Sequence, residues 1–345
     1  MEKVRFGKTE LMVSRIAFGG IPVMRVSMSD GAALVREAIN LGINFIDTAN
    51  VYGDSEEKVG EGIKGITRES LVIATKTQAA DKKTFLEHLD LSLKRMGTDY
   101  IDIYQLHNVS SEQKRDEIFA PRGAMEGMEE ALKAGKIRFP GFSSHKIPIA
   151  LELMKSGRFD TVQLPFNYID REAEDEAIPL AQKLDMGFIS MKPMGGGLLS
   201  NAELSFRYLL QFGNVVPDPG IEKLEEIREI AAIVKRKPSL TEDDRKEIES
   251  IRKEFASSWC HRCDYCLPCP QDIMISSVLN AMSFFKRFSL EKAKAMAGSA
   301  IENGKACLAC GDCVERCPYH LEIPRLLKEN INAWETAVAA KKSSS

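Results

Sequence analysis

The sequence predicts an α/β protein, a (β/α)8 or TIM barrel followed by a smaller, mostly α-helical domain. Three observations lead to this fold class. Short β-branched runs alternate eight times with amphipathic helical stretches between about residues 14 and 235. All eight cysteines lie beyond residue 259. The 345 residues also exceed the roughly 250 to 300 residues at which a single hydrophobic core usually stops growing.

The expected strands are short and regularly spaced. They cover residues 15–19, 44–47, 71–76, 100–107, 137–143, 161–166, 187–192 and 214–217. Between them, apolar residues recur at helical spacing, and most of these stretches end in glycine. Alternating strands and helices pair in parallel, and eight units in about 220 residues fit a closed barrel. The first unit also lacks the G-x-G-x-x-G that marks an open dinucleotide-binding sheet.

Outside the strand and helix alternation, the chain divides by composition. We expect a barrel over residues 1–235, with residues 4–13 forming a β-hairpin that closes its floor. The charged stretch 236–256 is typical of a polar linker that runs into a helix. Residues 257–335 form the cysteine-rich domain, and residues 336–345 a flexible tail.

Bulk composition indicates a globular protein without a polyanionic partner. Hydrophobic residues make up 44% of the chain, and the formal net charge is -3. We therefore expect neither nucleic acid nor a membrane surface as a partner. The N-terminal residues contain charges throughout, and no run approaches the ~18 apolar residues of a membrane span, so we expect a cytoplasmic protein.

Four polar residues lie at the ends of three successive expected strands, where (β/α)8 barrels place their active sites. They are Asp47, Tyr52, Lys76 and His107. An ammonium beside a phenol lowers the phenol pKa from ~10, a carboxylate can hold that ammonium, and a neutral imidazole can orient a substrate oxygen. Each residue alone also has a structural interpretation, as a turn cap, a loop contact, a surface lysine or a core histidine. Together they favour a proton-delivery site.

Four segments in this order resemble the signature segments of the aldo-keto reductases. They are GINFIDTANVYGDSE (42–56), VIATK (72–76), QLHN (105–108) and GKIRFPGFSSH (135–145). The resemblance implies an NAD(P)H-dependent carbonyl reductase, or alcohol dehydrogenase in reverse, acting on a small carbonyl or alcohol. It implies that Tyr52 is the general acid, Lys76 tunes it, Asp47 holds the lysine and His107 positions the carbonyl.

The same resemblance implies a set of cofactor-binding residues. Ser143, Ser144 and Gln163 match positions that bind the nicotinamide carboxamide, and Met191 lies where many relatives stack an aromatic ring. The loop 191–199, with Lys192 and the three glycines Gly195, Gly196 and Gly197, would wrap the pyrophosphate, although three glycines can also form a plain flexible turn. Near the adenosine 2′-phosphate the sequence offers Glu222 and only Lys223. These departures leave the choice between NADH and NADPH open.

The cysteines form two compact runs, which indicates metal binding and not disulfides. Residues 307–318 match the bacterial ferredoxin pattern C-x2-C-x2-C-x3-C-P, and residues 260–270 differ from it by one residue. In that pattern the last cysteine of each run ligates the other cluster. It therefore implies two 4Fe-4S clusters, one held by Cys260, Cys263, Cys266 and Cys317 and one held by Cys307, Cys310, Cys313 and Cys269. Two zinc sites are the alternative.

Barrel and cysteine domain together resemble an iron-sulfur branch of the aldo-keto reductases. Nicotinamide passes two electrons as hydride, whereas a cluster passes one, and the sequence contains no recognisable flavin motif to connect them. The clusters could exchange electrons with a ferredoxin or another one-electron carrier, work with a flavin, or serve structure or sensing. The alternative function is an iron-sulfur electron-transfer or redox-sensing protein whose barrel is not an active reductase.

Overall fold

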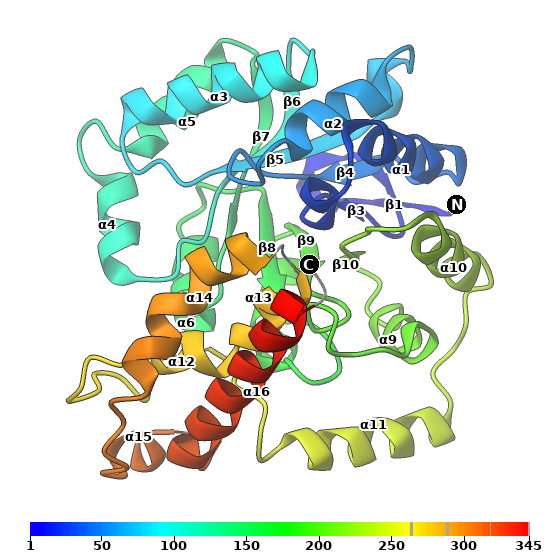
Figure 1. The fold of residues 1–345 in the computed structure, drawn as a ribbon. Helices are drawn as coiled ribbons and strands as arrows, with labels where there is room; N and C mark the ends of the chain where they lie inside the picture. The colour runs from blue at the N-terminus through cyan, green and yellow to red at the C-terminus, as the bar shows by residue number, and fades with distance from the viewer. Residues whose placement is uncertain (263–264, 288–289, 318, 344–345) are drawn as a thin grey trace. The chain divides into compact units, whose positions relative to one another are not determined.

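The computed structural model describes residues 1–262, 265–287, 290–317 and 319–343. The chain folds as two compact units, which are described separately (Figure 1). The first comprises Met1–Gly195 and Asn201–Leu240. The second comprises Gly196–Ser200 and the chain from Thr241 onward.

The first unit is built on an eight-stranded sheet in which every neighbouring pair is parallel and the strand order follows the sequence. Hydrogen bonds from Ala17 N to Pro217 O (2.8 Å) and from Gly19 N to Pro219 O (2.9 Å) join the first strand to the last and close the barrel. All eight predicted strands are confirmed within a few residues of their expected ends. The strands are β3 (Phe18–Gly19), β4 (Phe45–Asp47), β5 (Val72–Thr77), β6 (Ile101–Leu106), β7 (Ile137–Ser143), β8 (Thr161–Pro165), β9 (Gly187–Met191) and β10 (Val215–Asp218).

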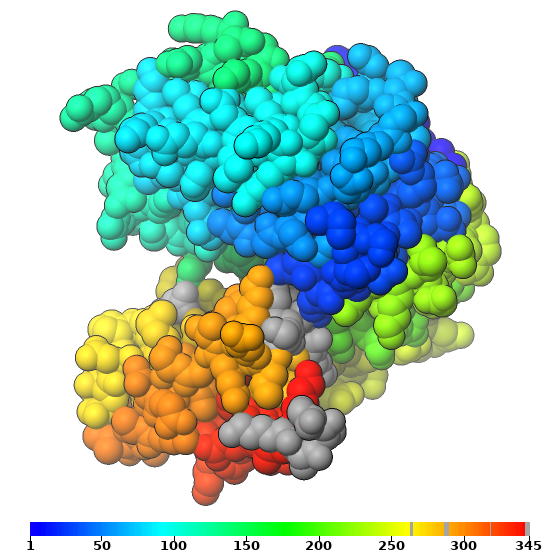
Figure 2. Space-filling view, turned by 45° about the horizontal axis from the view of Figure 1, so that its top comes forward, coloured from blue at the N-terminus to red at the C-terminus, as the bar shows by residue number. Residues whose placement is uncertain are grey.

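A layer of helices surrounds the barrel. Helices that are close in sequence pack against one another, for example α1 with α2, α2 with α3 and α3 with α5, and α10 packs against α1. The start of α3 is fixed by Asp81, whose carboxylate accepts from Thr84 N, and its end by Gly97 at a φ of 63°. Figure 2 shows the outer surface of this layer in blue through green. The helices are α1 (Met28–Asn40), α2 (Ser55–Ile63), α3 (Lys82–Met96), α4 (Glu112–Phe119), α5 (Ala124–Lys133), α6 (Ile147–Lys155), α7 (Glu172–Asp175), α8 (Ala177–Lys183), α9 (Ala202–Leu209) and α10 (Leu224–Lys235).

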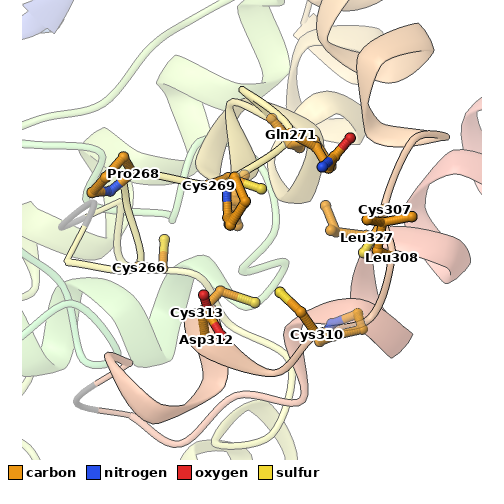
Figure 3. Close-up of a pocket in the computed structure, with 14 residues that line it drawn as sticks. Cys266, Pro268, Cys269, Gln271, Cys307, Leu308, Cys310, Asp312, Cys313 and Leu327 are labelled. Carbon is orange, nitrogen blue, oxygen red and sulfur yellow. The ribbon is translucent and has the colours of Figure 1, made fainter.

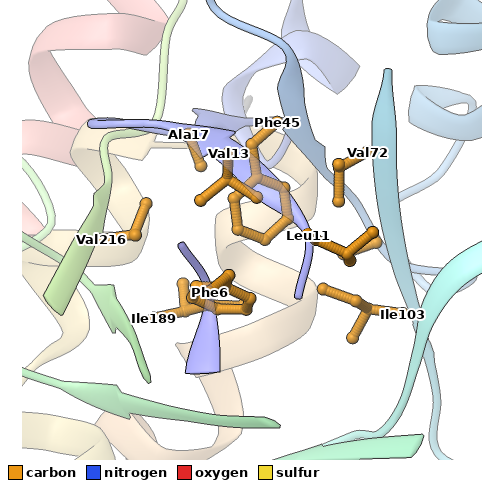
Figure 4. Close-up of a cluster of buried hydrophobic side chains, with 10 residues drawn as sticks. Phe6, Leu11, Val13, Ala17, Phe45, Val72, Ile103, Ile189 and Val216 are labelled. Carbon is orange, nitrogen blue, oxygen red and sulfur yellow. The ribbon is translucent and has the colours of Figure 1, made fainter. Parts of the chain in front are cut away.

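The expected hairpin at the barrel floor is present. Strands β1 (Lys3–Arg5) and β2 (Met12–Ser14) pair antiparallel, and the short helix η1 (Gly7–Thr9) lies between them. The hairpin side chains Phe6, Leu11 and Val13 pack against the first inward residues of the strands (Figure 4). The floor is therefore filled with apolar side chains, and polar side chains have room only at the opposite, C-terminal end of the strands.

The second unit is mostly α-helical, as predicted. Its helices α12, α13, α14 and α16 pack against one another around Val278, Ala297, Ile301 and Leu327. Short loops containing the cysteines lie between these helices. The helices are α11 (Glu242–Phe255), α12 (Ile275–Leu279), α13 (Ala281–Arg287), α14 (Leu290–Gly304), α15 (Asp312–Glu315) and α16 (Ile323–Ser343).

The last helix includes residues 336–343, where we expected a flexible tail. Its buried face continues to Trp334, whose ring lies 5.7 Å from that of Phe285. About two helical turns further on, the Lys341 ammonium lies 4.8 Å from the centre of the same Phe285 ring. These contacts with α13 explain why the helix continues. Among the described helices, none is long and apolar enough to cross a membrane.

Candidate active site and metal centre

Strand alternation explains why polar side chains gather at one end of the barrel. Phe45 and Val216 face the apolar floor, and successive inward residues on a strand are two positions apart. Asp47 follows Phe45 by two positions, and Asp218 follows Val216 by two. Lys76 likewise comes two positions after a floor residue of β5. The next inward layer above the floor is therefore polar.

Lys76 and Asp47 form an ion pair in this layer. The ammonium lies 2.5 Å from Asp47 Oδ2 and also donates to the carbonyl of Thr48 at 2.7 Å. Side-chain exposure is only 2% and 3% for the two partners. Burial alone would lower the pKa of Lys76, but its interactions, above all with the charge of Asp47, outweigh burial and raise that pKa. Lys76 is therefore a permanent cation inside the barrel.

Tyr52 and His107 complete the predicted set of four. The Lys76 ammonium lies 5.4 Å from the centre of the Tyr52 ring, and the rings of Tyr52 and His107 meet edge to face at 5.6 Å. Burial, and then the charge of Lys76, lower the pKa of His107 to about 3, so this imidazole is neutral. Its Nδ1 has no hydrogen-bond partner among the described residues. The structure thus brings all four predicted residues together.

The sequence analysis missed two further polar side chains of this layer, Gln105 and Asp218, whereas it did predict Gln163 as a site residue. Gln105 Nε2 donates to Asp47 Oδ1 at 3.4 Å, and Gln163 Nε2 donates to Asp47 Oδ2 at 3.3 Å and to Asp218 Oδ2 at 3.1 Å. Burial, and then the charge of Asp47, raise the pKa of Asp218 well above its usual range. Gln105 could have been found by alternation, because it precedes His107 by two positions.

Ser143, Ser144 and Gln163, which were expected to bind the nicotinamide carboxamide, differ in the hydrogen bonds that their side chains already make. Gln163 uses its amide N–H groups on the two carboxyls, and its Oε1 has no partner in the described part of the chain. Ser143 Oγ accepts from the N–H of Asn108 at 2.9 Å. Ser144 Oγ accepts from Lys146 N at 3.1 Å and so stabilises the turn before α6. Gln163 is therefore the best-placed acceptor of the three.

The loop after β9 has an unusual backbone. Met191 ends the strand, and Lys192 has a φ of 58°. Gly195, Gly196 and Gly197 follow with φ values of 58°, 69° and 92°, a region that L-residues with side chains rarely adopt. Met191, Lys192 and Gly195 belong to the first unit, and Gly196 and Gly197 to the second. The glycines are thus required by the backbone, and the N–H of Gly195 donates to the carbonyl of Lys192 at 2.8 Å.

The segment expected near the adenosine phosphate contains an ion pair. Arg25, in the short helix η2 (Pro22–Arg25), lies with its guanidinium 2.8 Å from Glu222 Oε2. Lys223 is exposed and begins α10, where Glu226 accepts from its backbone N–H at 3.0 Å. The sequence analysis missed Arg25, because only the fold brings residues this far apart in sequence together.

The second unit contains a pocket lined by five cysteines. They are Cys266, Cys269, Cys307, Cys310 and Cys313. In Figure 3 the sulfur atoms of Cys269, Cys310 and Cys313 point into the space between the labelled side chains. Burial raises the pKa of Cys313, and the neighbouring thiolates of Cys307, Cys310 and Cys269 raise it further.

Clustered thiolates repel one another, and a bound cation or cluster relieves that repulsion. The donor chemistry of the pocket therefore fits the iron-sulfur cluster that the sequence predicted. The other predicted group is described in part. Cys317 is buried and Cys260 half-buried, and neither lines this pocket, whereas Cys266, which was predicted to belong to the same group, does line it. Cys263 lies outside the described residues.

The two cysteine runs share a local backbone geometry. In each run the second residue after the first cysteine has a positive φ, 62° at Arg262 and 51° at Ala309. In each run the third residue after the last cysteine donates its N–H to that cysteine's carbonyl, at 2.9 Å for Asp272 and 3.0 Å for His320. The φ of both donors is 51°. The two runs thus begin and end with the same local backbone geometry, although, among the described residues, only the second contains a short helix, α15, between these points.

Comparison with known protein families agrees with both units. Residues 15–205, more than half of the chain, match the model of the aldo/keto reductase family. The chain belongs to the aldo/keto reductase family. Residues 259–321 of this aldo/keto reductase match the 4Fe-4S dicluster domain, so its second unit is an iron-sulfur domain.

Relatives of the barrel are found among characterised and uncharacterised oxidoreductases. The chain is 31% identical over 218 residues to the uncharacterized oxidoreductase YqkF of Bacillus subtilis, covering 59% of this chain and 68% of that protein. It is 30% identical over 230 residues to the NADH-specific methylglyoxal reductase of Escherichia coli, covering 58% and 69%. Among solved structures, the holo form of aldo-keto reductase AKR11C1 from Bacillus halodurans superposes with a TM-score of 0.64 at 26% identity, covering 73% and 96%.

Proposed function

We propose that this aldo/keto reductase transfers hydride between NAD(P)H and a small carbonyl or alcohol at the C-terminal end of its barrel. The arrangement of Lys76, Asp47, Tyr52 and His107 carries the proposal, because it combines a buried cation, a phenol and a neutral imidazole. The nicotinamide supplies the hydride when it is bound. Everything else in the reaction is the work of protein side chains.

Tyr52 is the proton donor in this proposal. Lys76, whose charge is fixed by Asp47, stabilises the phenolate that remains when Tyr52 gives its proton to the substrate oxygen. His107 is neutral at physiological pH, so it orients the carbonyl by hydrogen bonding and does not compete as an acid. In alcohol oxidation the same phenolate takes the proton back.

For the cofactor, the chain offers residues of three kinds. Gln163 Oε1 is an unsatisfied buried acceptor suited to the carboxamide N–H groups of nicotinamide. Ser143 pairs with Gln163 across strands β7 and β8, and the N–H of Ser144 donates to the Gln163 carbonyl. Met191 would contact the ring through its thioether. Lys192 and the glycines Gly195, Gly196 and Gly197 would contact the pyrophosphate, and Lys223 the adenosine ribose. Either NADH or NADPH fits these contacts.

We propose two 4Fe-4S clusters in the second unit. Cys307, Cys310, Cys313 and Cys269 would hold one cluster, which is supported by their place around a single pocket. Cys260, Cys263, Cys266 and Cys317 would hold the other, which the repeated loop geometry supports. The crossed fourth ligands follow the bacterial ferredoxin pattern. We place the barrel domain at residues 1–235, the linker at 236–256, the iron-sulfur domain at 257–335 and a terminal segment at 336–345.

The clusters would connect the chain to a one-electron carrier such as a ferredoxin. The test is anaerobic titration of reconstituted protein with NADH and with NADPH, in the presence and absence of methylglyoxal, the substrate named for the Escherichia coli relative. Nucleotide oxidation that depends on the carbonyl supports the reductase. If the clusters are reduced but neither methylglyoxal nor any aldehyde of a wider panel is turned over, the electron-transfer or sensing function is favoured.

A further inference from the structure

Two carboxyl groups and one ammonium belong to a single buried network at the C-terminal end of the barrel strands. Lys76 pairs with Asp47, and Gln163 links that carboxylate to Asp218 by donating to both. All four side chains are buried. Lys76 is the only cation among the groups that act most strongly on Asp218 in the described part of the chain. With both carboxyls ionised, the network would carry one uncompensated negative charge.

An uncompensated charge in this position is costly in the isolated protein. Burial, and then the charge of Asp47, raise the pKa of Asp218 well above its usual range, which favours the neutral, protonated form of this carboxyl. Any stability that this group contributes is complete below its unfolded-state pKa and is lost as the pH rises through the folded-state pKa. The second oxygen, Oδ1, has no hydrogen-bond partner among the described residues. An asparagine at position 218 would fill the same space without an ionisable group. The presence of an aspartate therefore points to a role for its ionisation.

The ionisable side chains that face Asp218 are few. Asp47 on β4 and Lys76 on β5 are its charged neighbours, and Tyr52 lies beyond the lysine. The adjoining strands β3 and β9 contain no ionisable residue. Proton exchange at Asp218 is therefore governed by this network and by whatever binds next to it.

We propose that Asp218 balances the charge of the oxidised cofactor, ionising when the cationic nicotinamide ring binds and staying protonated when the neutral reduced ring binds. This inference rests on the proposed nicotinamide site. Gln163 connects the two events, because its amide is held by both carboxyls while its Oε1 is open to the carboxamide. The proton that leaves Asp218 goes to solvent. The barrel would thereby prefer oxidised over reduced cofactor.

The experiment compares the oxidised nucleotide with a tetrahydro analogue, which has a neutral ring and cannot transfer hydride to substrate or clusters. Affinity and proton release are measured anaerobically by calorimetry, in buffers of different ionisation enthalpy. The comparison is made once with NAD and its tetrahydro analogue and once with NADP and its tetrahydro analogue. Within each pair both molecules carry the same ribose substituent, so the contribution of the 2′-phosphate to affinity cancels. The variant is Asp218→Asn, and the control is Asp90→Asn on the exposed side of α3.

For the wild type and the control, we expect the oxidised nucleotide to release more protons than the analogue. Asp218→Asn should remove this difference and weaken the oxidised nucleotide relative to the analogue by about tenfold. Equal losses for both nucleotides, or unchanged proton release, would overturn the role of Asp218. The wild-type proton release decides the question alone if the variant does not fold. Failure of both nucleotides to bind the wild type would instead refute the proposed cofactor site.

Discussion

The guanidinium of Arg25 lies 2.8 Å from the carboxylate of Glu222. This pair joins the loop after the first barrel strand to the segment before α10, where the sequence offered one acid and one base for the adenosine ribose. Glu222 is thus not a lone repulsive charge, because a partly buried cation already neutralises it. In the proposed cofactor site, the pair would control how much positive potential this segment offers a 2′-phosphate.

Breaking this pair should change the nucleotide preference. In the wild type we expect NADH to compete well with NADPH, within a factor of about a hundred, roughly 2.7 kcal/mol. Glu222→Gln should release Arg25 and improve NADPH relative to NADH by about three- to tenfold, because a guanidinium can then pair with the phosphate. Competition binding measures both values. Glu225→Gln, exposed on the neighbouring helix α10, is the control, and an equal effect in both variants would place the phosphate elsewhere.

Removal of the Tyr52 hydroxyl should stop the chemistry and spare binding. Tyr52→Phe keeps the ring that contacts His107 and loses only the hydroxyl group, which carries the proton to be transferred. Carbonyl reduction should therefore fall by about 10²- to 10⁴-fold, while nucleotide affinity stays within about twofold. Steady-state rates and nucleotide titration give the two numbers. Near-normal turnover in this variant would remove Tyr52 from the acid role.

The buried imidazole of His107 should make the barrel sensitive to acid. Its pKa is lowered to about 3, below the ~6.5 of an unfolded chain, so its contribution to stability is present above pH ~6.5 and is lost as the pH falls toward 3. His107→Gln should therefore lose less unfolding free energy between pH 7.5 and 5.5 than the wild type, by about 1 kcal/mol. Anaerobic urea unfolding at the two pH values measures this, and identical pH dependence would show that the imidazole can ionise in place.

Crossed ligation makes a specific prediction for the second unit. Anaerobically prepared protein should contain about eight iron and eight sulfide per chain. Cys317→Ser should damage the cluster of the distant Cys260 run more than the cluster of its own run. Electron paramagnetic resonance of the reduced variant, compared with Cys313→Ser, distinguishes the two clusters. Zinc alone after reconstitution would refute the clusters, and loss of the local cluster in the Cys317 variant would refute only the ligand assignment.

Much of this fold could be predicted because strands, helices and floor residues follow local patterns. Asp218 was missed because the predicted strand ended at residue 217, one residue before the end of β10. Asp218 lies between two prolines, at 217 and 219, a pattern that is more typical of a loop. Continuing the alternation from Val216 would have found it. The pairing of Arg25 with Glu222 and the helix through residues 336–343 depend on contacts between distant segments, which periodicity does not contain.

The central claim is that the barrel transfers hydride, and an isotope experiment tests it most directly. The protein is incubated anaerobically with nicotinamide nucleotide deuterated at the transferred position, with methylglyoxal and an aldehyde panel as acceptors. Our account predicts that one deuterium appears on the carbinol carbon of the product, from one face of the nicotinamide only, and that Tyr52→Phe abolishes the transfer. Product without deuterium on that carbon, or no product from any acceptor despite tight nucleotide binding, would contradict it.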